Sequence, residues 1–219
     1  MPFEPKLVIF DLDGTLIEYG HDFMFEQAER ILEDMGLAHM SRAQFEDHFY
    51  HDTLFDFFGE LRGEKEEEFW GKLKLAERPP QGLIDGVLPV FDELLTSNIK
   101  LAIATARAQD LNNLKSELRN LGLLKWIDIV TAREDSSSNW RDKRRQILLC
   151  CEHALALPQE SFMVGDNPSD LKSAHEVNTG GVIAVRTGRI KDHILQKENP
   201  HAILDHAGQL GSLIPSKKR

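Results

Sequence analysis

Short runs of apolar residues alternate with helical patterns along most of the chain. The first run, residues 6–10 (KLVIF), is rich in branched side chains and ends on Asp11. Comparable apolar runs follow at residues 100–105, 127–131, 161–165 and 181–185. The segments between these runs carry apolar residues three and four positions apart, as amphipathic helices do. Strands that alternate with helices predict an α/β fold with a doubly wound, Rossmann-like parallel sheet, whose ligands bind at the carboxyl ends of the strands.

One segment, residues 20–79, has helical patterns but no strand pattern. Its second predicted helix begins at Ser41, and Gln44 three residues later completes a capping box. Most of the chain's aromatic residues lie in this segment. We interpret them as its own hydrophobic core rather than as an aromatic cage for a ligand.

These patterns predict two parts. Residues 1–19 and 80–219 form the α/β core domain, and residues 20–79 form a small all-helical subdomain inserted after the first strand. The stretch Arg78-Pro79-Pro80 is a stiff linker, so we expect hinges near residues 19–20 and 78–80.

Charge and cysteine content narrow the functional classes. The 219 residues carry a net charge of -10, which disfavours nucleic acid and anionic membrane surfaces as partners. A site that handles phosphate in such a chain needs a local positive charge. The two cysteines, Cys150 and Cys151, are adjacent and are expected to be buried thiols on a helix. With no secretory signal in view, we predict a cytoplasmic location.

The strongest chemical signal is Asp11-Leu12-Asp13-Gly14-Thr15, directly after the first strand. Gly14 permits a tight turn, so Asp11 and Asp13 can face the same space. With a divalent cation present, one carboxylate can act as ligand and nucleophile while the other transfers protons. The alternative is an ordinary turn with incidental acidic residues.

Two further strand ends carry polar residues of the same kind. Asp166 follows the apolar run 161–165, and Asp170 lies one helical turn later. A helix start capped by Asp or Asn would explain this pair without any function. Acidic residues at two strand ends of a parallel sheet, however, can converge on one magnesium site. Thr105 ends the run 100–105, where a hydroxyl and backbone N–H groups suit a phosphate oxygen.

These motifs resemble the haloacid dehalogenase-like (HAD) superfamily, in particular its phosphoglycolate phosphatase-like hydrolases with a helical cap after the first motif. The resemblance implies that Asp11 forms an aspartyl-phosphate and that Asp13 is the general acid/base. It implies a Mg²⁺ site formed by Asp11, Asp13 and Asp166, with Asp170 supporting the metal. It also places Thr105 at the phosphate and makes residues 20–79 the cap.

Two positions depart from the family pattern. Ala106, predicted to contact the substrate, stands where many such phosphatases carry Asn. Arg107 follows, either reaching a substrate anion or lying in solvent at a helix start, and we favour the solvated position. The family's lysine is usually followed by proline, whereas its best match here, Lys143, is followed by Arg144. Arg141, Arg144 and Arg145 leave the identity of the site cation open.

The resulting prediction is a Mg²⁺-dependent phosphatase that acts on a small phosphorylated metabolite. Phosphoglycolate, sugar phosphates and nucleotides all remain open as substrates. A phosphomutase of the same family is one alternative, and a catalytically silent binding protein on this fold is another. A dehalogenase is disfavoured, because Asp13 and Asp166 imply a metal that carbon–halogen displacement does not need.

Overall fold

The computed structural model describes residues 4–54, 56, 63–75, 81–107, 110–133 and 141–214, with side chains of the third range described to residue 73. The predicted linker Arg78-Pro79-Pro80 lies outside these ranges. The chain forms two compact units. One consists of Met1–Glu18 with Gly82–Arg219, and the other consists of Tyr19–Gln81.

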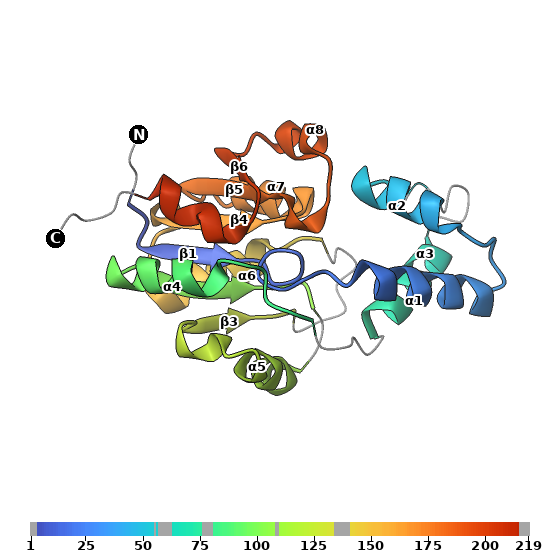
Figure 1. Cartoon of the computed structure of the whole chain (residues 1–219), viewed down its shortest axis with the longest axis horizontal. Coiled ribbons are helices and arrows are strands. Elements are labelled where there is room, and N and C mark those ends of the chain that lie inside the picture. The colour runs from blue at the N-terminus through green and yellow to red at the C-terminus, as the bar shows by residue number, and fades with distance from the viewer. Residues whose placement is uncertain are drawn as a thin grey trace. The chain divides into compact units, whose positions relative to one another are not determined.

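The first unit is built on a six-stranded sheet in which every pairing is parallel (Figure 1). The strand order is β3-β2-β1-β4-β5-β6. The strands are β1 Leu7–Phe10, β2 Lys100–Ala104, β3 Ile129–Thr131, β4 Ser161–Gly165, β5 Gly181–Val185 and β6 Ala202–Leu204. The predicted doubly wound parallel sheet is therefore confirmed.

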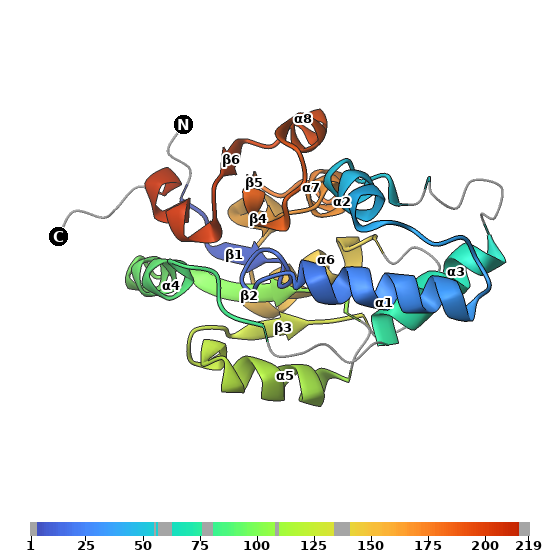
Figure 2. The ribbon, with the colours of Figure 1, turned by 45° about the vertical axis from the view of Figure 1, so that its right-hand side comes forward.

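Helices cover both faces of this sheet (Figure 2). Helices α6 (Arg144–Ala154) and α7 (Pro168–Glu176) pack together on one face. Helix α4 (Val87–Thr96), absent from the sequence prediction, packs against β2 and the closing 3₁₀ segment Ala207–Leu213. Helix α5 (Leu111–Asn120) contributes Leu114 and Leu118 to the same apolar core as α4.

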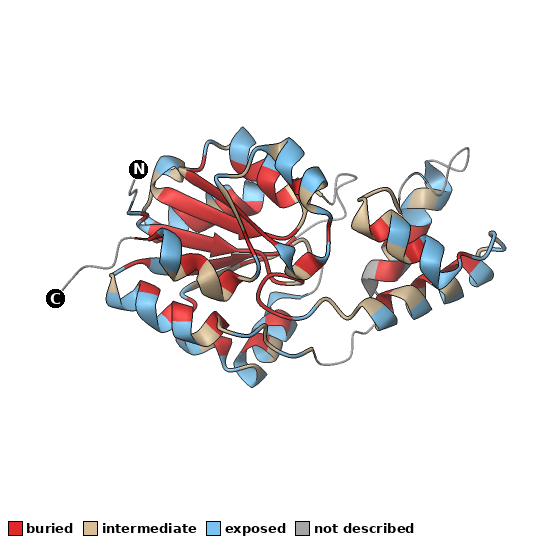
Figure 3. Cartoon of the chain, turned by 45° about the horizontal axis from the view of Figure 1, so that its top comes forward, coloured by how far each residue is buried: buried red, intermediate tan, exposed pale blue. Residues whose placement is uncertain are grey.

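The central strands are buried on both faces, as the red ribbons of Figure 3 show. Alternate residues of each strand point to opposite faces, so both layers of helices need apolar partners. Phe10 packs against Phe91 of α4 with ring centroids 5.2 Å apart. This explains why the strands appear in the sequence as nearly continuous apolar runs.

The strand order places the carboxyl ends of β1 and β4 at the point where the winding of the sheet reverses. The chain passes from β1 to β2 and β3 on one side, and then returns to β4 on the other side of β1. In open α/β sheets the crevice at this switch point is the usual ligand site. The residues that follow β1 and β4 therefore lie where such a site is expected.

The second unit contains helices α1 (His21–Asp34), α2 (Arg42–Tyr50) and α3 (Glu64–Leu75). The predicted capping box is present, because Ser41 and Gln44 exchange side-chain to backbone hydrogen bonds. Phe45 and Phe49 are buried with their rings stacked at 5.9 Å. These aromatic side chains form a hydrophobic core for the unit.

None of the described helices is long and apolar enough to cross a membrane. Cys150 and Cys151 are free, buried thiols on α6, as the sequence predicts.

Candidate active site

Asp11 stands at the end of β1, where its backbone N–H donates to the carbonyl of Val164 at 2.9 Å. This bond continues the β1–β4 pairing by one residue, so the backbone of Asp11 is fixed by the sheet. Its side chain is 9% exposed. The nucleophile predicted from the sequence thus lies at the switch point on a rigid support.

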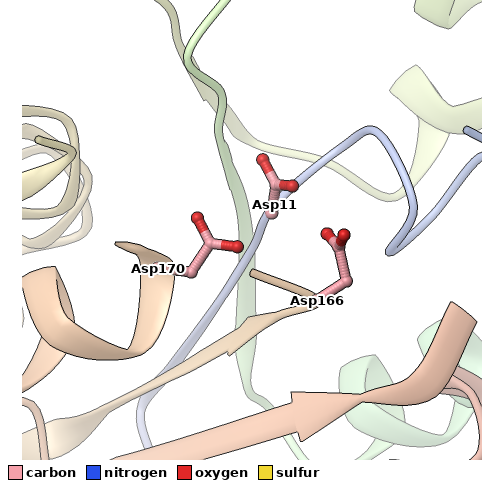
Figure 4. Close-up of side chains that lie close together, drawn as sticks. All are labelled: Asp11, Asp166 and Asp170. Atoms are coloured by element: carbon pink, nitrogen blue, oxygen red, sulfur yellow. The ribbon is translucent and has the colours of Figure 1, made fainter. Parts of the chain in front are cut away.

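Asp166 and Asp170 approach Asp11 from the junction between β4 and α7. Asn167 caps α7, and its own N–H donates to Asp170 Oδ2 at 3.2 Å. Asp166 accepts a hydrogen bond from the Thr15 hydroxyl at 3.0 Å. One carboxylate oxygen from each of Asp11, Asp166 and Asp170 lies within 4.8 Å of the others (Figure 4). The three carboxylates converge because parallel strands deliver their ends to one edge.

Lys143 is the basic side chain that the structure places between these acids. Its ammonium contacts the carboxylate of Asp11 and lies 2.5 Å from Asp170 Oδ1. Lys143 occupies the N-cap of α6, where its backbone N–H donates to the Ser173 hydroxyl at 3.1 Å. Arg144, next in the chain, is half-exposed and pairs with Asp142 instead. The fold orients residue 143 inward and residue 144 outward.

Burial and mutual repulsion raise the pKa of two of these carboxyl groups. The pKa of Asp11 rises to about 6, because burial disfavours the charged form more than Lys143 favours it. Burial and the neighbouring Asp11 charge raise the pKa of Asp166 well above its ordinary value. Burial opposes the charge of Lys143, yet Asp11 and Asp170 together raise its pKa above the ordinary value. Without a further cation, this cluster holds more negative charge than its surroundings favour.

The donor set fits Mg²⁺. All three converging groups are carboxylates, the hard oxygen ligands that this ion prefers. Three carboxylates and one ammonium leave two negative charges, which one divalent cation would neutralise. Among the described residues, no other group of three His, Cys, Asp or Glu side chains has metal-binding geometry.

Asp13, the fourth predicted ligand, lies outside this cluster. Its carboxylate accepts two hydrogen bonds from Arg107, at 2.8 Å from Nε and 2.6 Å from Nη2. The Arg107 side chain is only 8% exposed and also pairs with Glu117 at 2.7 Å. The expectation of a solvated Arg107 is therefore wrong, because its largely buried guanidinium pairs with both Asp13 and Glu117.

Thr105 directly follows β2, close to the predicted position. Its backbone N–H donates to the carbonyl of Thr131 at 3.0 Å, so this N–H is not free for a phosphate. Its hydroxyl accepts from the Arg107 N–H at 3.2 Å and keeps its own proton for donation. Ala106 lies between them and is half-buried.

The sequence pattern did not single out the turn after β5, whose Gly188 lies against Asp166. The Thr187 hydroxyl in this turn donates to the carbonyl of Gly14. A Cβ atom on Gly188 would lie 1.9 Å from Asp166 Oδ2. The available signal was positional, since Thr187 and Gly188 come just after another apolar run of the same sheet.

We expect Gly188→Ala to weaken Mg²⁺ binding, because the added methyl group must displace the Asp166 carboxylate. Changes behind a metal ligand typically cost about 10–100-fold in metal affinity. Titration calorimetry with Mg²⁺ measures this directly. Gly71→Ala is the matched control, because no atom lies within 4 Å of its new methyl group. Equal affinity in the wild type and Gly188→Ala would show that this glycine does not hold Asp166 in place.

A family model and several known proteins match this chain over most of its length. A family model described as haloacid dehalogenase-like hydrolase matches residues 8–185. The tyrosine-protein kinase PtkA of Mycobacterium tuberculosis is 26% identical over 220 residues, covering 95% of this chain and 71% of that protein. The pyrophosphatase PpaX of Bacillus pumilus is 24% identical over 176 residues, covering 78% of this chain and 79% of PpaX.

Solved structures share the fold over nearly the whole length. A predicted phosphoglycolate phosphatase from Haemophilus somnus 129pt superposes with a TM-score of 0.69 at 18% identity. The match covers 97% of this chain and 98% of that one. At this identity the likeness concerns the fold alone.

Proposed function

Because the chain belongs to the haloacid dehalogenase-like hydrolase family, we propose that it is a Mg²⁺-dependent phosphatase that uses Asp11 as its nucleophile. The family model describes hydrolases. The relative named as a pyrophosphatase supports cleavage of a bond between phosphorus and oxygen.

One observation carries the proposal. Lys143 fixes the Asp11 carboxylate at the switch point of the sheet. Two further buried carboxylates lie beside it, and neither contributes to the hydrophobic core. Burying three acids around one lysine costs stability, and a fold keeps such an arrangement where chemistry uses it.

The chain's own residues account for both halves of the reaction. A carboxylate oxygen of Asp11 attacks phosphorus, and the bond between phosphorus and the leaving oxygen breaks. Asp13 gives a proton to that oxygen, so an alcohol departs and an aspartyl-phosphate remains. Water then attacks this phosphorus, Asp13 takes the proton of the water, and inorganic phosphate leaves with Asp11 restored.

Charge neutralisation comes from several directions. The Lys143 ammonium faces the oxygens that gather charge during transfer, and the Thr105 hydroxyl can donate to another of them. Mg²⁺ held by Asp11, Asp166 and Asp170 would supply the remaining positive charge and orient the phosphoryl group.

The substrate is proposed to be a small phosphorylated metabolite. The unit formed by Tyr19–Gln81 is proposed to be the cap that selects it, since it is inserted directly after the first motif. Release of inorganic phosphate from a panel of phosphate esters, with and without Mg²⁺, tests the function. Absence of turnover across that panel would favour a silent binding protein. Turnover that requires a sugar bisphosphate would favour a phosphomutase.

A second candidate function is phosphoryl transfer to a protein tyrosine. The relative named as a tyrosine-protein kinase matches 95% of this chain, and a phosphorylated Asp11 could pass its group to a hydroxyl other than water. Labelled ATP with a tyrosine peptide separates the two functions. A kinase labels the peptide, whereas a phosphatase releases only inorganic phosphate.

We expect Mg²⁺ to stabilise the folded protein, because it binds a carboxylate cluster that the unfolded chain lacks. A ligand at a concentration one hundred times its dissociation constant adds about 2.7 kcal/mol to the free energy of unfolding. For a chain of this size that corresponds to a rise in Tm of about 5–10 °C. Thermal unfolding with Mg²⁺ and then with excess EDTA measures the shift.

Asp166→Ala should abolish most of this rise in Tm. Asp128→Ala is the matched control, since Asp128 is an exposed acid of the same unit. A wild-type Tm that does not respond to Mg²⁺ would contradict the metal site without reference to activity.

A further inference from the structure

Arg107 lies in the loop after β2 and forms hydrogen bonds with four other residues. Its backbone N–H donates to the Thr105 hydroxyl at 3.2 Å, and its carbonyl accepts from the Arg133 N–H at 3.1 Å. Its guanidinium pairs with Asp13 on one edge and with Glu117 on another. Bonds to both backbone and side chain fix the position and the direction of this arginine.

The contact with Asp13 is a fork rather than a single bond. Nε and Nη2 of Arg107 reach one carboxylate oxygen each, at 2.8 and 2.6 Å. Such paired bonds fix the plane of a carboxylate, which a single donor cannot do. A carboxylate has about four lone-pair positions, of which the fork takes two. The fork therefore limits the rotation of Asp13 without occupying all of its acceptor sites.

Glu117 holds the other end of the guanidinium. It accepts from Arg107 Nη1 at 2.7 Å and stands on α5, whose Leu114 and Leu118 are fully buried in the core. A helix fixed by its apolar face is a rigid support for a polar contact at the edge of that face. The chain of contacts thus runs from the core through α5, Glu117 and Arg107 to Asp13.

The geometry points to Arg107 as a positioning residue that aims the Asp13 carboxylate at the leaving-group oxygen, with Glu117 as its support. This inference rests on the proposed function, in which Asp13 gives its proton to that oxygen. Proton transfer requires donor and acceptor within hydrogen-bond reach in the correct direction, so a freely rotating Asp13 would serve poorly. Neither arginine nor glutamate needs to touch the substrate in this role.

The nature of the leaving group separates positioning from a merely structural role. An alkyl phosphate needs a proton on its departing oxygen, whereas an activated aryl phosphate such as p-nitrophenyl phosphate departs as a stable phenolate. Arg107→Lys keeps the positive charge but loses the fork. It should lower kcat/KM for the alkyl ester by at least about tenfold, and for the aryl ester by less than about threefold. Glu117→Gln should also lower kcat/KM for both esters, by smaller factors.

A double-mutant cycle with Asp13→Asn assigns the effect to its partner. Asp13→Asn alone should lower turnover of the alkyl ester by about 10²–10⁴-fold. If Arg107 acts through Asp13, adding Arg107→Lys should change that rate by less than about twofold. Arg119→Lys is the control, because Arg119 is an exposed arginine in the last turn of α5, the helix that carries Glu117. It should leave both rates unchanged.

Each outcome has a distinct meaning. Equal losses on the two esters, or additive losses in the cycle, overturn the positioning role while the proposed function stands. A wild type that releases phosphate from neither ester overturns the proposed function and this role with it. Loss confined to the alkyl ester and absent in the Asp13→Asn background supports the assignment.

Discussion

Replacement of Asp11 by Asn is expected to reduce phosphatase turnover by at least about 10³-fold, because the variant has no nucleophile to accept the phosphoryl group. Asn is close to Asp in size and shape, so the loss is chemical rather than steric. A burst of covalently bound phosphate, measured by rapid quench, should appear in the wild type and be absent from the variant.

The same variant is expected to remain folded and to show an unchanged or higher Tm at neutral pH without metal. The raised pKa of Asp11, about 6, means that ionised Asp11 costs stability in the folded state. The sign follows from linkage: its favourable contribution is complete below the unfolded value of 3.8 and is lost as the pH rises through about 6. A neutral Asn avoids that loss.

Paired kinetics and thermal unfolding of Asp11→Asn check both statements. Asp128→Asn is the control for removal of an acidic charge in the same unit, and its turnover should equal that of the wild type. Turnover of Asp11→Asn within tenfold of the wild type would exclude a covalent mechanism on this residue.

Removal of the Lys143 ammonium is expected to have the second large effect, on both rate and stability. Lys143→Ala leaves the carboxylates of Asp11 and Asp170 buried without their cation. Breaking a buried ion pair from one side typically costs about 3–5 kcal/mol. The loss of a preorganised positive charge from the transition state typically lowers kcat by about 10²–10³-fold.

Two further variants keep this prediction testable if Lys143→Ala does not fold. Lys143→Met has a side chain of similar length without the charge. Its kcat should be lowered, but its side chain should restore packing that Lys143→Ala loses. Lys143→Arg keeps the charge and should retain more of the stability than Lys143→Met. The free energy of unfolding should recover partly when Mg²⁺ is added to either uncharged variant. A near-normal kcat in Lys143→Met would show that another cation faces the phosphate.

The architecture followed from local patterns because the central strands are buried on both faces. Runs such as residues 161–165 and 181–185 are therefore nearly all apolar, and the structure places β4 and β5 at these bounds. Helix α4 escaped prediction although Val87, Val90, Phe91 and Leu94 recur at helical spacing on its buried face, so the signal was present in the sequence. Closure by the 3₁₀ segment Ala207–Leu213, which covers α4, involves contacts distant in sequence.

The candidate site likewise contains residues that the sequence predicted and a residue that only the fold could identify. Asp11, Asp166 and Asp170 were determined by the sequence, because each follows a recognisable strand and the ends of parallel strands share one edge. Lys143 could not be separated from Arg141, Arg144 and Arg145 by pattern, since the direction of each side chain depends on how α6 begins. That direction is decided by the packing of α6 against the sheet and α7.

Arg107 shows most clearly what only the tertiary structure decided. Its partners Asp13 and Glu117 lie 94 and 10 positions away in the chain, so no local pattern links all three residues. The same holds for Gly188, whose missing side chain makes room for Asp166. The sequence alone determined which strand ends carry acids, because burial imposes a local pattern on strands. Which charges meet was decided by folding, because ion pairs and close approaches form between segments that only the completed sheet brings together.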